Sequence, residues 1–471
     1  MENTIAAIST NNIGSSAINI VRITGPEAIQ IVAKIFTNKK FATASSHTIH
    51  YGFIKDGDNT IDEVLVSLMR APKTYTKEDM VEINCHGGYV TTNKILELLL
   101  NNGASLAQPG EFTKKAFMNG RISLLEAESI SDLLESKTEE QAKMALQGLT
   151  GKTTELIKSL REEMVSLLAN IEVNIDYPEY TDELVITKEN ITPTLTKIKT
   201  SLQSILSESK NGELIKNGIN IAIIGRPNVG KSSLLNTFLE KDKAIVTDIS
   251  GTTRDIVEGS IVYKGIVYNF IDTAGIRETT DFVEQIGVKK SKELLASSDY
   301  NILVINNNDS LTSEEKSLIT ELESKKGLIF INKNDLPSLL EPFKTTKKII
   351  KGSTITKEGI EEIKETILND FSLSDLGNKD LTYLSNTRQI SLVKSSLNKI
   401  ENVIKQNTLD IPVDMLAIDI KSAWEDLGKV IGDYYEDELV DNIFQRFCIR
   451  STTNYHRFML CVTCYTYISF I

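Results

Sequence analysis

Residues 225–232 read G-R-P-N-V-G-K-S, and this short stretch decides the fold of the segment around it. An apolar run at 219–224 precedes it and predicts a buried strand, and a helical pattern follows it. In a G-x-x-x-x-G-K-[ST] loop, glycines let backbone N–H groups point at phosphate oxygens. Lys231 would then neutralise phosphate charge, and the Ser232 hydroxyl would ligate Mg²⁺. A chance glycine turn is the alternative, which the flanking strand and helix disfavour. The stretch therefore predicts a phosphate-binding α/β domain.

Three later motifs indicate that the nucleotide is a guanine nucleotide. D-T-A-G at 272–275 follows the strand-like run 267–271, so its carboxylate can reach the Mg²⁺ shell and its last N–H the γ-phosphate. N-K-N-D at 332–335 follows the run 328–331, and the Asp335 carboxylate can accept from the N1 and N2 donors of guanine. Adenine would leave that carboxylate unpaired. G-S-T at 352–354 stands where a closing loop would support the base. Each motif alone is weak, but the series favours a GTPase over an ATPase.

The residue after D-T-A-G is Ile276, where Ras-like enzymes carry the glutamine that positions the attacking water. Hydrolysis here must therefore orient its water in another way. The P-loop, G-T-T-R-D at 251–255 and D-T-A-G-I-R-E at 272–278 together resemble the MnmE (TrmE) family of potassium-activated tRNA modification GTPases. The resemblance extends from Thr4 to Ile449.

The resemblance implies that a K⁺ ion stands in for an arginine finger. Its ligands would be Asn228 and the backbone carbonyls around Thr247, Ile249 and Thr252. Thr253 would join Ser232 on Mg²⁺, and matching the segment 281–287 to the family gives Glu284 as the residue that positions water. A solvated helix carboxylate is the alternative interpretation of Glu284. Lys231 and the two cations would provide most of the rate by electrostatic stabilisation.

The expected nucleotide and cation site collects the residues of these motifs. They are Asn228, Val229, Gly230, Lys231, Ser232, Ser233, Thr247, Asp248, Ile249, Ser250, Gly251, Thr252, Thr253, Asp272, Thr273, Ala274, Gly275, Asn332, Lys333, Asp335 and Ser353.

Length and composition fit a large cytoplasmic protein. The 471 residues, 41% hydrophobic and 25% charged, suffice for two to four domains. No apolar run of about 18 residues and no basic stretch before an apolar core occurs, so we expect neither a membrane span nor a secretion signal. Four cysteines in this length argue for reduced thiols. The net charge of −12 is unexpected for a nucleic-acid partner, so any RNA contact must be local or supplied by a second protein.

The pattern along the chain predicts three kinds of domain. Residues 1–121 hold strand-like segments at 4–9, 17–24, 63–69 and 80–84 with helices between them, an α+β domain. Residues 122–217 and 372–449 are helical, and they bracket the α/β unit at 218–371. The helical stripes are Leu160, Met164, Leu167, Leu168, Ile171 and Ile175, and then Leu416, Ile420, Trp424, Leu427 and Ile431. We therefore expect a P-loop GTPase (Ras-like) domain inserted into an all-α helical domain. Residues 450–471 form an atypical tail, whose lone C-x-x-C at 461–464 is weak evidence for a metal site.

The N-terminal region carries its own resemblance to the same family. V-R-I-T-G at 21–25, T-K-E-D at 76–79, E-I-N-C-H-G-G at 82–88 and P-G-E-F at 109–112 resemble its folate-binding and dimerising domain. Guanidinium and carboxylate groups suit the amide face and the glutamate tail of a folate. The resemblance implies that Arg22, Glu82 and Arg121 contact a tetrahydrofolate one-carbon donor, a 5-formyl or 5,10-methylene derivative. His86 could act as a catalytic base, although a lone histidine near a turn is more often structural.

The resemblance also implies an activity and partners. F-C-I at 447–449 matches the end of the family pattern, where Cys448 corresponds to the cysteine of the modification chemistry; Arg450 and Ser451 replace the family's closing Gly-Lys, one of its folate contacts. The family's GTP hydrolases help to install an aminomethyl or carboxymethylaminomethyl group on C5 of the wobble uridine of certain tRNAs. The implied assembly is a homodimer that forms a heterotetramer with a flavin-dependent partner.

Two other classes of function share parts of this pattern. An RNA-binding switch GTPase of the ribosome-assembly class would have similar P-loop and G-T-T-R-D segments, but we would expect it to add a basic RNA-binding module. A dimerising scaffold with a regulatory GTPase is the third possibility, and it would be favoured if Cys448→Ser left modification intact.

Overall fold

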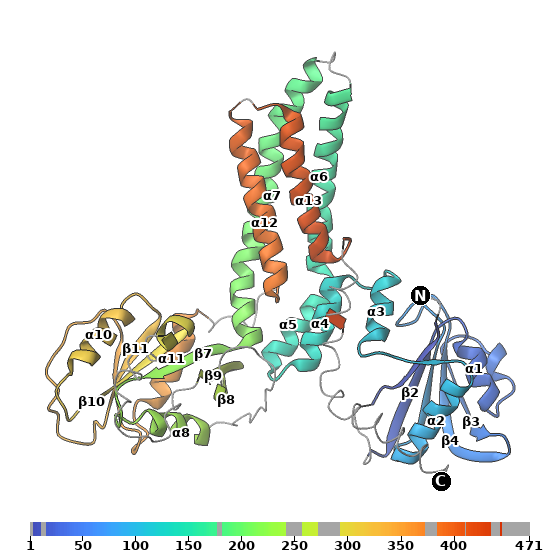
Figure 1. The fold of residues 1–471 in the computed structure, drawn as a ribbon, viewed down its shortest axis with the longest axis horizontal. Coiled ribbons are helices and arrows are strands. Elements are labelled where there is room, and N and C mark those ends of the chain that lie inside the picture. Colours follow the sequence, from blue (N-terminus) through green and yellow to red (C-terminus); the bar gives the residue numbers. More distant parts are fainter. Residues whose placement is uncertain are drawn as a thin grey trace, which may run out of the picture. The chain divides into compact units, whose positions relative to one another are not determined.

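The chain divides into two compact units, residues 1–131 with 427–471 and residues 132–426. The structure, a computed structural model, describes residues 3–10, 16–176, 181–241, 257–271, 293–372, 384–409, 411–434 and 443–444 (Figure 1). Within the described ranges, no helix is long and apolar enough to cross a lipid bilayer.

The N-terminal unit is built on a six-stranded sheet in the order β3-β4-β5-β2-β1-β6. Its strands are β1 (Ile5–Ile8), β2 (Ile18–Thr24), β3 (Thr48–Asp56), β4 (Asn59–Met69), β5 (Met80–His86) and β6 (Ser105–Leu106). Its helices are α1 (Ala28–Ile35), the 3-10 helix η1 (Phe41–Thr43), α2 (Tyr89–Asn101), α3 (Glu111–Met118) and α4 (Leu124–Glu135), which runs into the second unit. Neighbouring strands are antiparallel except β1 and β6.

One face of this sheet is apolar and buried, and the predicted α+β class is confirmed. In β4, Val64, Val66 and Leu68 are buried, whereas Leu65 between them is 49% exposed, as the two-residue period of a strand requires. The buried side chains form one core with α1 and α2. Between the strand-like segments 17–24 and 63–69 the sequence predicted only helix; α1 confirms a helix there, but β3 was missed. Ile49 and Tyr51 occupy the exposed face of β3 while Gly52 and Ile54 face inward, so the strand shows no clean alternation of polar and apolar residues.

The helical part of the second unit comes from two separated stretches of the chain, as predicted. Its helices are α5 (Glu139–Leu149), α6 (Lys152–Asp176), α7 (Thr181–Asn217), α12 (Thr387–Asn407) and α13 (Val413–Ile431), the last of which ends in the first unit. Helix α7 packs against both α6 and α12 (Figure 1). The predicted stripes are buried at Leu160, Met164 and Ile171 on α6 and at Leu416 and Ile420 on α13. Because α7 ends at the residue before Gly218 and β7, the α/β domain is inserted between the two helical stretches.

The inserted domain is a six-stranded sheet in the order β12-β11-β10-β7-β9-β8, parallel except for the β8–β9 hairpin. Its strands are β7 (Ile219–Ile224), β8 (Val257–Tyr263), β9 (Ile266–Ile271), β10 (Tyr300–Asn306), β11 (Gly327–Asn332) and β12 (Ile349–Lys351). Its helices include α8 (Lys231–Lys241), α10 (Ser313–Leu322) and α11 (Ile360–Asp370).

Both faces of this sheet are buried, which explains why β7 is apolar throughout. Ile221 and Ile223 belong to a core shared with α8 and α11, whereas Ala222 and Ile224 belong to a second core shared with α10. A parallel sheet covered by helices on both faces is the α/β architecture predicted for this segment. Its loops at the carboxyl ends of the strands are therefore free to bind a ligand.

Candidate nucleotide site

The loop between β7 and α8 has backbone conformations that favour glycine. Gly225 has φ +146° and Gly230 has φ +102°. A Cβ atom at Gly225 would lie 2.5 Å from the carbonyl oxygen of Val304, and one at Gly230 would lie 2.2 Å from Nδ2 of Asn332. Asn228 is also left-handed, with φ +64°. The two glycines of the motif are therefore needed both for their conformation and for close packing against residues of the neighbouring strands β10 and β11.

Lys231 begins α8, and its ammonium lies inside the loop. Nζ donates to the backbone oxygens of Gly225 at 2.8 Å and Arg226 at 2.9 Å. Burial lowers the pKa of this ammonium below its ordinary value, because desolvation disfavours the charged form. A nearby phosphate would favour the charged form. The site is therefore arranged so that Lys231 gains by binding an anion.

Two exposed side chains, one in the loop and one in the first turn of α8, offer oxygen ligands. Asn228 and Ser232 are exposed, and neither side chain makes a hydrogen bond or ion pair with another described residue. Amide and hydroxyl oxygens are ligands that hard cations such as Mg²⁺ and K⁺ prefer. The residue types and their exposure fit the predicted cation site.

Asn332, at the end of β11, connects three of the predicted motifs. Its Nδ2 donates to the backbone oxygen of Val229 in the P-loop at 2.8 Å, and its Oδ1 accepts from the backbone N–H of Thr354 at 3.1 Å. Asp335, three residues further on, is exposed and makes no hydrogen bond with another described residue. The structure thus brings N-K-N-D, the P-loop and G-S-T together at one edge of the sheet.

Two further site residues lie in the same loops. Lys333 has φ +63°, a left-handed conformation that starts the turn after β11. Ser353 is buried, and its hydroxyl accepts from the backbone N–H groups of Ile355 and Thr356. Ser353 therefore shapes the G-S-T loop. The sequence could not show the role of Thr354, because its bond to Asn332 joins residues that are far apart in the chain.

Several predicted site residues lie outside the part of the chain that the structure describes. They are Thr247, Asp248, Ile249, Ser250, Gly251, Thr252, Thr253, Asp272, Thr273, Ala274, Gly275, Glu284 and Cys448.

The three residues predicted in the N-terminal unit share one cluster. Arg22 on β2 faces Glu82 on β5, and Nε and Nη2 of Arg22 lie 2.8 Å and 2.7 Å from Oε1 of Glu82. The guanidinium carbons of Arg121 and Arg22 lie 4.8 Å and 5.9 Å from the ring centroid of Tyr75. Arg22 also lies 5.6 Å from the ring centroid of Phe112. The cluster therefore presents two cations, a carboxylate and two aromatic rings, and the sequence missed the part played by Tyr75.

Comparison with known proteins decides the family. A family model described as "GTP-binding protein TrmE N-terminus" matches residues 4–121, and one described as "MnmE helical domain" matches residues 124–448. The "tRNA modification GTPase MnmE" of Bacillus cytotoxicus is 45% identical over 453 residues, which is 95% of this chain and 99% of that protein. The same-named protein of Listeria welshimeri is 46% identical over 452 residues, with the same coverage. The chain belongs to the MnmE family.

Comparison with solved structures finds a weak likeness. The G domain of the T. maritima FeoB iron transporter is 26% identical with a TM-score of 0.23, and the match covers 32% of this chain and 97% of that one. At that TM-score, the likeness says nothing further about this chain. The MnmE family models, by contrast, cover both flanks of the inserted domain, where a ribosome-assembly factor would be expected to carry a basic RNA-binding module.

Arg226 of this MnmE-family chain ties the P-loop to the connection before α10, a contact that the sequence did not reveal. Its guanidinium pairs with Asp309, and its Nε lies 3.2 Å from Oε1 of Glu315. Glu315 is almost fully buried and also forms a reciprocal capping box with Thr312. The T-x-x-E pattern at 312–315 predicts the cap but not the arginine. Two carboxylates from another element therefore hold the second residue of the P-loop.

His86 is held by a carboxylate at the surface of the N-terminal unit. Its Nδ1 lies 2.7 Å from Oδ1 of Asp62, and its backbone N–H donates to Oδ2 of the same residue at 2.8 Å. This hydrogen bond raises the pKa of the imidazole above 6.5. The ring itself is largely exposed, and Asp62 is the one side chain among the described residues to which it is hydrogen-bonded. The geometry favours the structural interpretation of His86.

The pKa of His86 provides a direct test of this pairing. We expect it to titrate above 6.5 in NMR spectra and to return toward 6.5 in Asp62→Asn. Because the folded-state pKa is raised, the stabilisation is complete below pH 6.5 and is lost as the pH rises through the folded-state value. His47, which has no carboxylate partner among the described residues, is the internal control. An unchanged His86 titration in Asp62→Asn would contradict the pairing.

Proposed function

We propose that this chain is a cytoplasmic, potassium-dependent GTP hydrolase that acts in the modification of the wobble uridine of certain tRNAs. The observation that carries the proposal is the pair of hydrogen bonds made by the Asn332 side chain. They link the proposed phosphate-binding loop to the loop proposed to recognise the base. Such a link would make phosphate binding and guanine selection parts of one site. Relatives named as tRNA modification GTPases over 95% of the chain support the same activity.

Each predicted residue has one task in the proposed mechanism. Lys231 would neutralise the β- and γ-phosphates, and Asp335 would accept from guanine. Ser232 and Thr253 would hold Mg²⁺, and Asn228 would hold K⁺ with the carbonyls of Thr247, Ile249 and Thr252. When bound, these cations supply positive charge at the phosphates. Glu284 would orient the attacking water, a task for which Ile276 has no polar group.

Nucleotide choice tests the basic activity. The purified chain with Mg²⁺ and K⁺ should hydrolyse GTP at least about a hundredfold faster than ATP at equal, subsaturating concentration, because adenine leaves the Asp335 carboxylate without its donors. Phosphate release measured with GTP and with ATP gives this ratio of rates. Lys231→Ala should lose the GTP activity, whereas Lys73→Ala, an exposed lysine of the N-terminal unit, should retain it. Equal rates with GTP and ATP would contradict the proposal.

We further propose that the N-terminal cluster binds a 5-formyl- or 5,10-methylene-tetrahydrofolate. Arg22 and Glu82 are both about a quarter exposed, so their polar atoms remain accessible to a ligand. A guanidinium beside a carboxylate can pair with the amide face of a pterin, and the Tyr75 ring offers a stacking surface. Arg121 would attract the carboxylates of the glutamate tail.

The exposed face of the N-terminal sheet supports the proposed homodimer. Ile18, Ile49, Tyr51 and Leu65 are each about half exposed or more and come from three strands of the sheet. An apolar face of this kind commonly marks a protein interface. A flavin-dependent partner would complete the proposed heterotetramer and take part in the redox chemistry of the modification.

Cys448 is the residue that we propose for the modification chemistry itself. The tRNA from a strain that carries only Cys448→Ser should accumulate wobble uridine without the aminomethyl-type group, while GTP turnover of the purified variant stays unchanged. Nucleoside analysis by mass spectrometry measures the unmodified wobble uridine, and phosphate release measures GTP turnover. Cys85, which is buried on β5, is the control: Cys85→Ser should leave the modification in place. Full modification in the Cys448→Ser strain would favour the scaffold interpretation.

A further inference from the structure

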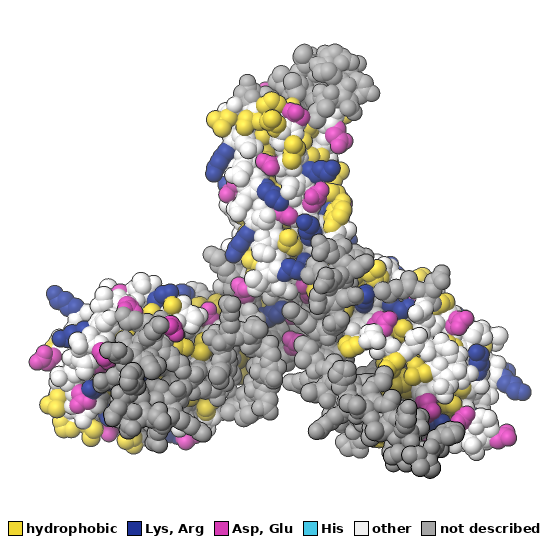
Figure 2. All heavy atoms as spheres, in the orientation of Figure 1, with side chains coloured by type: hydrophobic (Ala, Val, Ile, Leu, Met, Phe, Trp, Pro, Cys, Tyr) yellow, Lys and Arg dark blue, Asp and Glu magenta, His cyan; other side chains and the backbone are white. Residues whose placement is uncertain are grey.

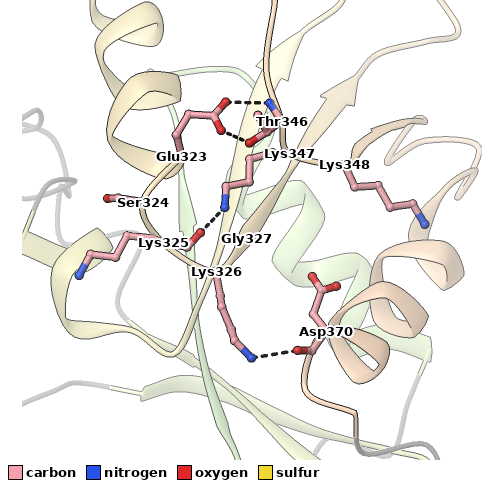
Figure 3. Close-up of a pocket in the computed structure, with 9 residues that line it drawn as sticks. All are labelled: Glu323, Ser324, Lys325, Lys326, Gly327, Thr346, Lys347, Lys348 and Asp370. Carbon is pink, nitrogen blue, oxygen red and sulfur yellow. Dashed lines mark hydrogen bonds between the residues drawn. The ribbon is translucent and has the colours of Figure 1, made fainter.

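We propose that a lysine-lined hollow on the GTPase domain contacts the phosphate backbone of tRNA, an inference that rests on the proposed function. The hollow has a volume of about 550 Å³ and is open to solvent. Four lysines line it, Lys325, Lys326, Lys347 and Lys348, together with the carboxylates of Glu323 and Asp370 (Figure 3). Four cations and two anions give the lining a formal charge of +2, in a chain whose net charge is −12.

The position of the hollow separates it from the nucleotide site. It lies where β11 and β12 begin and where α10 and α11 end, because its residues are 323–327, 346–348 and 370. The P-loop and N-K-N-D lie at the opposite, carboxyl ends of the strands. RNA bound at the hollow would therefore leave the nucleotide loops accessible.

The two carboxylates of the hollow are engaged by neutral donors rather than by its lysines. Glu323 accepts from the Thr345 hydroxyl at 2.6 Å, from the Thr346 N–H at 3.0 Å and from the Thr346 hydroxyl. These hydrogen bonds lower the pKa of Glu323 to about 2. Asp370 accepts from the hydroxyl of Tyr300 at 2.6 Å. The acids therefore shape the hollow and form no ion pair with its ammonium groups, although the charge of Lys347 also helps to lower the pKa of Glu323.

The lysines keep donors available for a ligand. Lys326 donates to the backbone oxygen of Asp370 at 2.9 Å, and Lys347 donates to that of Lys325, so two ammonium groups satisfy carbonyls near helix ends. Each ammonium has three N–H donors, and one carbonyl uses only one of them, although the Lys326 ammonium also lies 4.0 Å from the ring centroid of Phe371. The ammonium of Lys325 makes no hydrogen bond or ion pair with another described residue. Within the described ranges, Lys348 alone of the four is paired with a carboxylate, that of Glu362 at 3.0 Å.

The arrangement fits an extended polyanion better than a single small anion. In Figure 3, Lys326 and Lys347 point into the hollow from neighbouring segments, whereas Lys325 and Lys348 extend to opposite sides. Ser324 and Thr346 add hydroxyl groups, which are common partners of phosphate oxygens. On the face shown in Figure 2, cationic and anionic side chains are intermixed over the described surface. A local basic hollow is what an acidic chain needs to hold RNA by its backbone.

Salt-dependent binding of an unmodified tRNA transcript to the full chain tests this inference. We expect Lys325→Gln with Lys347→Gln to weaken binding about tenfold at low salt and to reduce the slope of log K against log [KCl] by roughly two, one for each ammonium–phosphate pair removed. The arginine pair, Lys325→Arg with Lys347→Arg, should keep the wild-type slope because it keeps the charge. Lys39→Gln with Lys40→Gln removes the same charge from exposed positions of the N-terminal unit and should change binding less than twofold.

The controls distinguish this inference from the proposed GTPase activity. GTP turnover without RNA should be the same in all these variants, because the hollow lies at the far end of the strands. The inference is overturned if the glutamine pair binds tRNA as the wild type does, or if the Lys39 and Lys40 pair weakens binding to the same extent. A wild-type chain that binds no tRNA at all would also overturn it, and would assign tRNA binding to a partner protein while leaving potassium-dependent GTP turnover untouched.

Discussion

GTP turnover by this chain is expected to fall about a thousandfold when Na⁺ replaces K⁺ at matched ionic strength, the lower end of what an arginine finger contributes to hydrolysis. The physical reason is charge. Lys231 supplies one cation to the loop, and Arg226, the nearest arginine in the motif, is held by Asp309 and Glu315. A monovalent ion at Asn228 would replace the missing positive charge at the transition state.

Single substitutions separate this ion from a general salt effect. Asn228→Ala should be slow in both salts, because its side-chain oxygen is one of the proposed ligands. Asn59→Ala, at the exposed first residue of β4 in the N-terminal unit, should keep the wild-type ratio of rates in KCl and NaCl. Glu284→Ala should slow hydrolysis in KCl while nucleotide binding, measured with a fluorescent analogue, stays unchanged. Equal wild-type turnover in the two salts would rule out the cation mechanism.

Asp335→Asn is expected to reverse the preference for the base. The ratio of kcat/KM for GTP to kcat/KM for xanthosine triphosphate should change by about 10⁴, the scale on which a polar site rejects a ligand that lacks its hydrogen-bond partner. In the proposed site the carboxylate of Asp335 would accept from the 2-amino group of guanine, and an asparagine amide could instead donate to the 2-oxo group of xanthine. GTP turnover should therefore fall, and xanthosine triphosphate should become the better substrate. Steady-state kcat/KM for both nucleotides measures the exchange.

A matched substitution in the same loop controls for damage to the fold. Asn332→Ala removes the hydrogen bonds to Val229 and Thr354. It should therefore lower kcat/KM for both nucleotides alike and give no preference for xanthosine triphosphate. If Asp335→Asn behaved in the same way, without gaining activity on xanthosine triphosphate, Asp335 would be a structural residue rather than the one that selects the base.

Local patterns in the chain were sufficient to predict the fold class and the strand, loop and helix around the P-loop. G-R-P-N-V-G-K-S between an apolar run and a helical pattern predicts a strand, a loop and a helix from neighbouring residues alone, and β7, the P-loop and α8 confirm that order. The stripe at 160–171 likewise predicts a buried helix face from spacing. Strand β3 was missed because both of its faces carry apolar or small residues.

The sequence by itself determined the motifs, their order and the family that they resemble, because these depend on residues close together in the chain. Only the tertiary structure decided which distant residues meet: Asn332 with Val229 and Thr354, Arg226 with Glu315, and both Arg22 and Arg121 with Tyr75. The same holds for the lysine-lined hollow, whose residues come from the ends of two strands and two helices. Contacts of this kind depend on how strands and helices pack, and spacing along a sequence carries no record of that packing.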